Sequence, residues 1–347
     1  MRHKFMVLIL VLLVGLGGVF MVSAAGQQGE EAGEMEEKTA EDLEIVYIPK
    51  NTGNPYFDSI IGGFEKAADE LGFNFTTVAP ATAEATSQLP FIRTQIQRGV
   101  DVIAISPNSP DALNRIFEQA MNEGIKVVVV NSDIPGSEEY RDVAILPMDF
   151  EITGSSQVEL MGSLIDYEGK IAILSATTDA PDQNYWIEGM KETLEEPKYQ
   201  DMELVEVAYG DDDPQKSTTE AEALLTKYPD LRGIISPTTV GVAAAAQVVE
   251  NAGRAPELQV TGLGTPNQMR RFIKNGTVEA FALWSPFDEG YLAGYLSTQL
   301  ALGETEAAEG VDFEVPGLGT RTIGENRVVI TGPPTVFTAE NIDDYNF

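Results

Sequence analysis

The sequence predicts an α/β protein of two lobes, each built on a parallel β-sheet. Short apolar runs rich in β-branched residues alternate with longer segments of helical period, which is typical of βαβ units. The alternation occurs in two series that meet near residue 147. Glycines follow several predicted helices, where a left-handed residue ends a helix without a Cβ clash: Gly72, Gly99, Gly124, Gly253 and Gly276. The length of 347 residues suits two domains, at roughly 150 residues per domain.

The two series give the predicted elements in order. In the first series we expect strands at 45–48, 73–78, 102–105 and 127–130, with helices at 57–71, 87–97 and 110–121. In the second series we expect strands at 170–174, 204–207, 233–235 and 259–262, with helices at 184–194, 216–226, 240–251 and 267–274. Two Rossmann-like lobes follow from this count.

The end of the chain completes the two lobes. A helical run at 289–302 and a β-like run at 327–330 remain, and we expect each to complete one lobe. The predicted N-terminal lobe then comprises 43–147 plus 285–328, and the C-terminal lobe 148–284 plus 329–347. The chain would cross between the lobes three times, and such a multi-strand hinge permits closure.

The first 25 residues read as a secretory signal peptide. A positive stretch at 2–4 precedes an apolar run at 5–22 and the small residues Ser23, Ala24 and Ala25. An uncleaved membrane anchor is the alternative, because 18 apolar residues nearly span a bilayer. Residues 26–42 are acidic, without apolar periodicity, and read as a linker. We expect a protein of the periplasm or another extracytoplasmic space.

The composition excludes several functions. His3 is the single histidine and there is no cysteine, which removes imidazole bases, thiol nucleophiles and zinc sites built on either residue from the mature chain. The formal charge of −33 disfavours a nucleic-acid partner. Phosphate-binding, dinucleotide-binding and nucleophile-elbow motifs are absent, so we expect no cofactor, no metal and no enzymatic activity.

Polar residues follow the predicted strands, where ligands of open parallel sheets bind. Amide, carboxylate and hydroxyl groups can hold vicinal hydroxyls, while aromatic faces cover the C–H faces of a sugar ring. The candidate ligand contacts are Lys50, Tyr56, Phe57, Asn131, Asp133, Asp182, Gln183, Pro237, Thr239 and Trp284. Other roles stay open: Lys50 as a solvated surface side chain, Asn131 and Asp133 in turns, Asp182 and Gln183 as helix N-caps, and Trp284 or Trp186 in a core.

The segment IVYIPKNTGNPYFDSIIGGFEKAADELG at 45–72 resembles the opening of the type I periplasmic sugar-binding proteins of ABC importers. Further segments are similar to the subgroup that binds autoinducer-2 or rhamnose. They are IPK at 48–50, ISPNSPDAL at 105–113, NSD at 131–133, DQNYW at 182–186, GLGTPNQMR at 262–270, GTVEAFALW at 276–284 and FTAENIDDYNF at 337–347. The similarity covers nearly everything from Leu43 to Phe347.

The resemblance implies specific contacts. Lys50, Asp182, Gln183 and Pro237 match the residues that hold the ligand in autoinducer-2 receptors. Two positions depart from that pattern: Asn131 replaces an aspartate, and Thr239 stands where those receptors have alanine. These departures favour another polyol, such as rhamnose or another aldose, with autoinducer-2 as the alternative ligand.

The resemblance also implies partners. We expect a monomer that delivers a small sugar or polyol to an ABC permease of the inner membrane. One alternative is a receptor that presents its ligand to a chemosensor or two-component system. A carboxylate-based enzyme acting on glycosides and a sugar-responsive repressor core are the remaining alternatives; the acidic charge and the leader disfavour the repressor.

Overall fold

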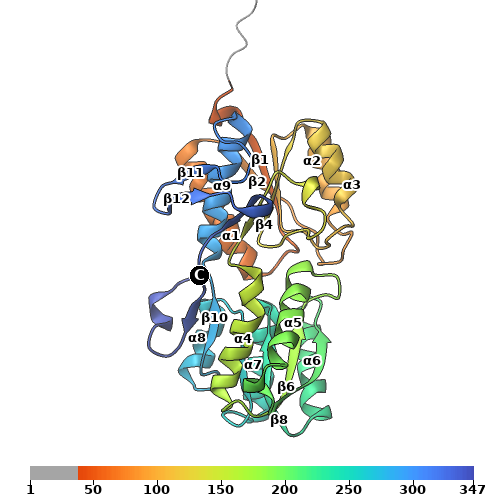
Figure 1. Cartoon of the computed structure of the whole chain (residues 1–347), viewed down its shortest axis with the longest axis vertical. Coiled ribbons are helices and arrows are strands. Elements are labelled where there is room, and N and C mark those ends of the chain that lie inside the picture. Colours follow the sequence, from red (N-terminus) through yellow and green to blue (C-terminus); the bar gives the residue numbers. More distant parts are fainter. Residues whose placement is uncertain (1–37) are drawn as a thin grey trace, which may run out of the picture. The chain divides into compact units, whose positions relative to one another are not determined.

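The computed structural model describes residues 38–347, and Figure 1 shows their two α/β lobes. The predicted signal peptide and most of the predicted acidic linker lie outside these residues. Within the described end of that linker, residues Ala40–Asp42 form a short 3-10 helix with Thr39 at its N-cap. Lys38 pairs with Asp101 beside it.

The N-terminal lobe contains a six-stranded sheet in the order β13-β5-β4-β3-β1-β2, with all neighbours parallel. Its central strands are buried along almost their whole length, which explains their continuous apolar runs. The strands are β1 (Glu44–Ile48), β2 (Asn74–Thr77), β3 (Val102–Ile105), β4 (Lys126–Val130), β5 (Val143–Leu146) and β13 (Val328–Ile330). The helices are α1 (Pro55–Leu71), α2 (Leu89–Arg98), α3 (Asn114–Asn122) and α9 (Pro286–Leu302). A hairpin of β11 (Asp312–Val315) and β12 (Gly319–Thr322) follows α9.

The C-terminal lobe contains a four-stranded parallel sheet in the order β7-β6-β8-β9. Its strands are β6 (Gly169–Ser175), β7 (Met202–Tyr209), β8 (Leu231–Ser236) and β9 (Gln259–Gly262). Its helices are α4 (Phe150–Leu164), α5 (Pro181–Leu194), α6 (Pro214–Lys227), α7 (Thr239–Ala252) and α8 (Pro266–Lys274). Strand β10 (Phe281–Leu283) bridges to the segment after β9 and pairs antiparallel with β14 (Thr335–Phe337). The two parallel sheets confirm the predicted fold class.

The chain passes between the two sheets after β5, after β10 and after β13. The prediction that the last two elements complete one lobe each is wrong. Helix α9 packs on α1, and β13 pairs with β5, so both belong to the N-terminal lobe. The lobe boundary expected at residue 328 therefore falls after Ile330, and β14 enters the C-terminal lobe.

Two local elements of the N-terminal lobe differ from the prediction. Strand β5 lies outside the predicted elements although its residues are a short apolar run. The helix expected from residue 110 begins at Asn114 instead. The Ser109 hydroxyl accepts hydrogen bonds from the amides of Asp111 and Ala112, at 3.4 and 3.1 Å, and this turn delays the helix.

Glycine permits the close packing of helices beside the lobe interface. A Cβ on Gly63 of α1 would lie 2.1 Å from the Phe287 carbonyl oxygen of α9, and one on Gly290 would lie 2.0 Å from the Ile60 carbonyl oxygen. In the other lobe, a Cβ on Gly154 of α4 would lie 2.4 Å from the Trp186 carbonyl oxygen of α5. These contacts hold α9 against α1 and α5 against α4.

Candidate ligand-binding site

A cavity lies between the lobes at the carboxyl ends of the parallel strands. The space between its wall atoms, including solvent at its open side, amounts to about 340 Å³. Residues of both lobes and of the hinge line it: Lys50, Asn54, Tyr56, Phe57, Asn131, Asp182, Gln183, Trp186, Asp212, Pro237, Thr238, Thr239, Leu263, Leu283 and Trp284. The structure thus brings all the predicted contacts except Asp133 to one place.

An ion pair between Lys50 and Asp182 crosses from one lobe to the other. Lys50 follows β1 and Asp182 is the second residue of α5; both are buried. The Lys50 Nζ lies 2.6 Å from Asp182 Oδ1 and donates more weakly to Gln183 Oε1 at 3.4 Å. Among residues 38–347, the second oxygen of Asp182 has no hydrogen-bond partner. Lys50 is therefore not a surface side chain, and the Asp182 carboxylate retains a free acceptor.

Asp182 and Gln183 do not cap helix α5. The N-cap position belongs to Ala180, which makes no side-chain capping bond, and Pro181 begins the helix. A carboxylate in the first turn is still favourable, because the helix dipole is positive at this end. The Gln183 amide nitrogen lies 3.5 Å from the Pro237 carbonyl oxygen, so Gln183 and Pro237 lie together on the same wall.

A second hydrogen bond between the lobes joins Asn54 and Thr239. Asn54 caps α1 by accepting from the Tyr56 amide at 3.0 Å, and the same oxygen lies 3.0 Å from the Thr239 hydroxyl of α7. Asn54 was not among the predicted contacts. Its position directly before Pro55 is a cap signal that the sequence contains.

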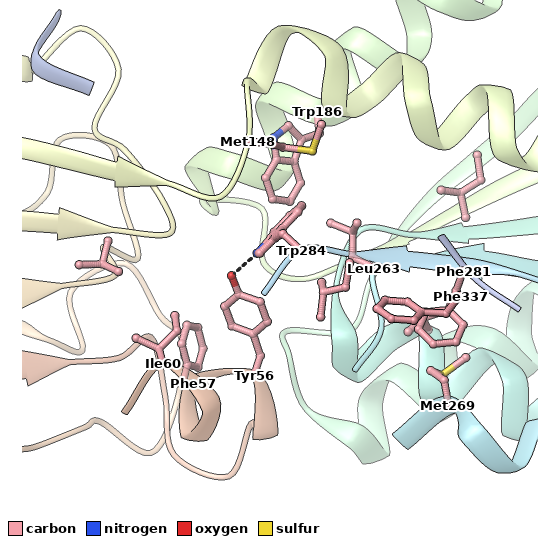
Figure 2. Close-up of a cluster of buried hydrophobic side chains, with 14 of the residues drawn as sticks. Tyr56, Phe57, Ile60, Met148, Trp186, Leu263, Met269, Phe281, Trp284 and Phe337 are labelled. Carbon is pink, nitrogen blue, oxygen red and sulfur yellow. Dashed lines mark hydrogen bonds between the residues drawn. The ribbon is translucent and has the colours of Figure 1, made fainter. Parts of the chain in front are cut away.

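Aromatic side chains form one wall of the cavity. Figure 2 shows Tyr56, Trp284 and Trp186 in a row between the lobes, with Phe57 beside Tyr56. The two indole rings are 5.8 Å apart between centroids and edge to face, and Tyr56 meets Trp284 at 6.4 Å in the same manner. The buried indole nitrogen of Trp186 has no hydrogen-bond partner in the part of the chain that the structure describes. Both tryptophans line the cavity, whereas the sequence analysis gave only Trp284 as a candidate ligand contact.

A polar cluster lies behind this wall. The Tyr56 hydroxyl is 2.5 Å from Asn131 Oδ1, 2.8 Å from Glu289 Oε2 and 2.6 Å from the Trp284 indole nitrogen. Glu289 is fully buried, and burial is the main reason that its pKa is raised well above the usual value. The sequence reasoning missed Glu289, which is an acidic residue inside the mostly apolar helix α9.

Asp212 is a further cavity residue that the sequence reasoning missed. It precedes α6, is buried, and accepts a hydrogen bond from the Thr238 hydroxyl. Burial raises the pKa of its carboxyl, while the Thr238 hydrogen bond lowers it. No sequence signal separates Asp212 from its exposed neighbours Asp211 and Asp213.

Asp133 is the one predicted contact whose side chain does not line this cavity. Both of its oxygens accept from the Arg141 guanidinium, at 2.6 and 2.7 Å, and Arg141 is fully buried. Arg141 also donates to the Asn326 carbonyl at 2.9 Å. Through Arg141, Asp133 therefore ties the segment after β4 to the segment before β13, which is a structural role within one lobe.

The described residues contain no group of three metal-ligating side chains and no helix long and apolar enough to cross a membrane.

Comparisons with known proteins agree with this architecture. A family model for a periplasmic binding protein domain matches residues 45–305. A sugar ABC transporter structure from Actinomyces odontolyticus is 41% identical, covering 89% of this chain and 99% of that chain, with a TM-score of 0.71. An ABC transporter solute-binding protein from Clostridium phytofermentas with bound L-rhamnose is 31% identical, covering 88% and 98%, with a TM-score of 0.84.

A relative of known ligand is also a sugar-binding protein. The D-ribose/D-allose-binding protein of Pseudomonas aeruginosa is 25% identical over 71% of this chain and 78% of its own length. The family model covers well over half of the chain, and the two solved structures are more than 30% identical across most of it. The chain therefore belongs to the periplasmic binding protein family, whose members are binding proteins and not enzymes.

Proposed function

We propose that this chain is the sugar-binding component of an ABC importer and works outside the cytoplasm. The family and the similarity to a sugar ABC transporter structure support this assignment. The relatives named for D-ribose, D-allose and L-rhamnose support a monosaccharide as the ligand class.

The buried hydrogen-bonding groups that line the cavity give this proposal its main support. The free oxygen of Asp182 can accept a hydrogen bond from a sugar hydroxyl. Lys50 adds donors at the same place. A sugar would satisfy these buried groups, which are costly to leave without partners. The aromatic rings of Tyr56 and Trp284 can cover its C–H faces.

The mechanism is capture by closure. The Lys50–Asp182 and Asn54–Thr239 contacts each join the two lobes, so they form only when the lobes meet. A ligand that touches both walls binds the closed form more tightly than the open form and shifts the equilibrium toward it. The three chain crossings act as the hinge. Small-angle X-ray scattering should show a smaller radius of gyration with saturating sugar; an unchanged radius would contradict closure.

Among monosaccharides we favour an aldose such as L-rhamnose over autoinducer-2. Asn131 offers an amide where the autoinducer-2 receptors present a carboxylate. Thr239 fills space that their alanine leaves open, and its hydroxyl is engaged by Asn54. Asn131 changes the hydrogen bonding of the cavity beside Tyr56 and Trp284, and Thr239 changes its wall beside Asn54.

This preference can be tested with two substitutions made together. In isothermal titration calorimetry, wild-type protein should bind L-rhamnose or another aldose more tightly than autoinducer-2. The double variant Asn131→Asp, Thr239→Ala should narrow or reverse the ratio of the two affinities. Asn131 has a left-handed backbone (φ 69°), which aspartate also tolerates, so the change tests chemistry more than folding. A wild-type preference for autoinducer-2 over every aldose tried would contradict the proposed ligand.

A further inference from the structure

The Tyr56 hydroxyl has more hydrogen-bond partners than protons to share. The Trp284 indole can only donate, so the Tyr56 oxygen accepts from it. The single Tyr56 proton must then serve both Asn131 Oδ1 at 2.5 Å and Glu289 Oε2 at 2.8 Å. If Glu289 is ionised and the Asn131 oxygen faces Tyr56, one of these two short contacts joins two acceptors. One of the two neighbours must therefore supply a proton of its own.

Two arrangements satisfy this count. In the first, Glu289 is protonated and donates to Tyr56, and Tyr56 donates to the Asn131 oxygen. In the second, Glu289 is ionised and accepts from Tyr56, and the Asn131 amide is rotated so that its NH₂ donates to Tyr56. The two arrangements leave opposite ends of the Asn131 amide for the cavity: the NH₂ donor in the first and the carbonyl acceptor in the second. The Ser132 hydroxyl, 3.4 Å from Asn131 Nδ2, can donate or accept and so tolerates both.

The surrounding structure holds these groups in place. Tyr56 on α1, Asn131 after β4 and Glu289 on α9 all belong to the N-terminal lobe, so opening of the hinge does not separate them. The contact between α1 and α9 at Gly63 and Gly290 leaves no room for a Cβ, and this fixes Glu289 beside Tyr56. These three side chains therefore lie together before any ligand arrives, and Trp284 joins them from the hinge segment between β10 and α9.

Burial and the nearby Asp182 carboxylate favour the protonated form of Glu289. The side chain is fully buried, and burial raises its pKa more than any other influence. Asp182 of α5 raises this pKa further, while the Tyr56 hydroxyl, the Asn131 backbone and Lys50 lower it. The charge of an ionised Glu289 would also raise the pKa of Tyr47 in β1. A raised pKa means that Glu289 is neutral at lower pH and ionises as the pH rises, so the donor arrangement should give way to the acceptor arrangement with increasing pH.

We infer that Glu289 is a positioning residue that decides, through the Tyr56 hydroxyl, which end of the Asn131 amide faces the ligand. This inference deepens the proposed function and rests on it for the identity of the ligand class. It gives a residue outside the cavity wall control over whether a sugar hydroxyl at Asn131 must accept or donate.

The first test needs no ligand. The chain has two tryptophans, so a Trp186→Phe variant assigns the indole N–H signal of Trp284 in a ¹H–¹⁵N spectrum. This signal should move as the pH is raised above the usual pKa of a glutamate, because burial raises the pKa of Glu289. Glu289→Gln should abolish the movement, and Tyr56→Phe should abolish it as a second, independent variant. A titration that is the same in wild type and in both variants would overturn the inference.

The matched control is Glu70→Gln. Glu70 also accepts from tyrosine hydroxyls of α9, those of Tyr291 and Tyr295, but it is exposed and lies outside the cavity. Hydrogen bonds from Lys66 and these tyrosines lower its pKa to about 2, so it stays ionised throughout the titration. The Glu70→Gln variant should keep the wild-type titration of the Trp284 signal.

The second test uses L-rhamnose as the probe in calorimetry over the same pH range. The dissociation constant of wild type should change by about two- to tenfold, the effect of exchanging one hydrogen-bond donor for an acceptor. Glu289→Gln should remove the part of this pH dependence that comes from Glu289. Any pH dependence that remains is then the contribution of Asp212. Identical pH profiles in wild type and Glu289→Gln would overturn the inference. If no sugar binds, the proposed function fails, while the ligand-free titration still decides whether Glu289 and Tyr56 are coupled.

Discussion

Two buried ion pairs stand near the ends of strands, and they differ in where their partners lie. Arg141 and Asp133 belong to one lobe, and both carboxylate oxygens accept from the guanidinium. Lys50 and Asp182 belong to different lobes, and one Asp182 oxygen has no partner among residues 38–347. The first pair is complete within a lobe, whereas the second forms only on closure and keeps an acceptor for a ligand.

The difference separates a structural pair from a binding pair. Charge and burial do not distinguish them, because all four side chains are largely buried. The distinction comes from the number of satisfied hydrogen-bonding atoms and from the lobe to which each partner belongs. A bidentate arginine leaves nothing for a ligand, while a lysine that bridges two lobes can exchange its partner for a sugar hydroxyl.

The largest effect should follow from breaking the pair within the lobe. Arg141→Met leaves Asp133 buried without its partner and removes the bond to the Asn326 carbonyl. We expect a loss of about 3–5 kcal/mol in the free energy of unfolding, measured by urea denaturation. A loss under about 1 kcal/mol would show that this pair does not hold β13 in place.

Breaking the pair between the lobes should act on binding instead. Lys50→Met should weaken sugar binding by about ten- to a hundredfold in calorimetry, the range for a hydrogen bond to a charged group. The unfolding free energy of the ligand-free protein should change less than in Arg141→Met, because Asp182 can reach water when the lobes open.

The matched control for Lys50→Met is Lys66→Met. Lys66 also forms a lysine–carboxylate pair at 2.6 Å, with Glu70, but its side chain is 48% exposed and the pair lies on one helix. Exposed pairs of this kind contribute little, so sugar affinity should stay unchanged. A Lys50→Met variant that loses stability but keeps its affinity would make Lys50 a structural residue like Arg141.

The sequence predicted the fold and most of the cavity for definite physical reasons. Buried parallel strands produce continuous apolar runs, and their carboxyl ends mark the ligand side, which located Lys50, Asn131 and Asp182. The same rule selected Asp133, whose side chain does not line the cavity, because the rule cannot tell which way a side chain after a strand points. Pairing with Arg141, eight residues later, is a matter of tertiary structure.

The missed residues depend on contacts between distant segments. Glu289 reaches the cavity cluster because α9 returns from the far end of the chain to pack on α1. Asp212 lies within a run of three aspartates, of which only the middle one is buried. The assignment of β13 to the N-terminal lobe likewise rests on its pairing with β5, which no local pattern contains.

A smaller effect is expected at the second contact between the lobes. Thr239→Ala removes a neutral hydrogen bond to Asn54 that forms on closure, so sugar affinity should fall by about two- to tenfold. Thr226→Ala is the control, because its hydroxyl bonds only within α6 on the exposed surface. Equal affinities in the two variants would mean that the Asn54–Thr239 contact does not contribute to closure.

The central claim is that the cavity between the lobes holds a monosaccharide through Asp182, and a thermal-shift screen tests it most directly. A ligand that binds only the folded state raises the melting temperature, by about 5 °C when present at a hundred times its dissociation constant. At least one monosaccharide should do this for wild type and for the control Asp179→Ala, an exposed aspartate just before α5, and not for Asp182→Ala. The account would be contradicted if no monosaccharide shifted the wild-type melting temperature, or if Asp182→Ala responded as strongly as wild type.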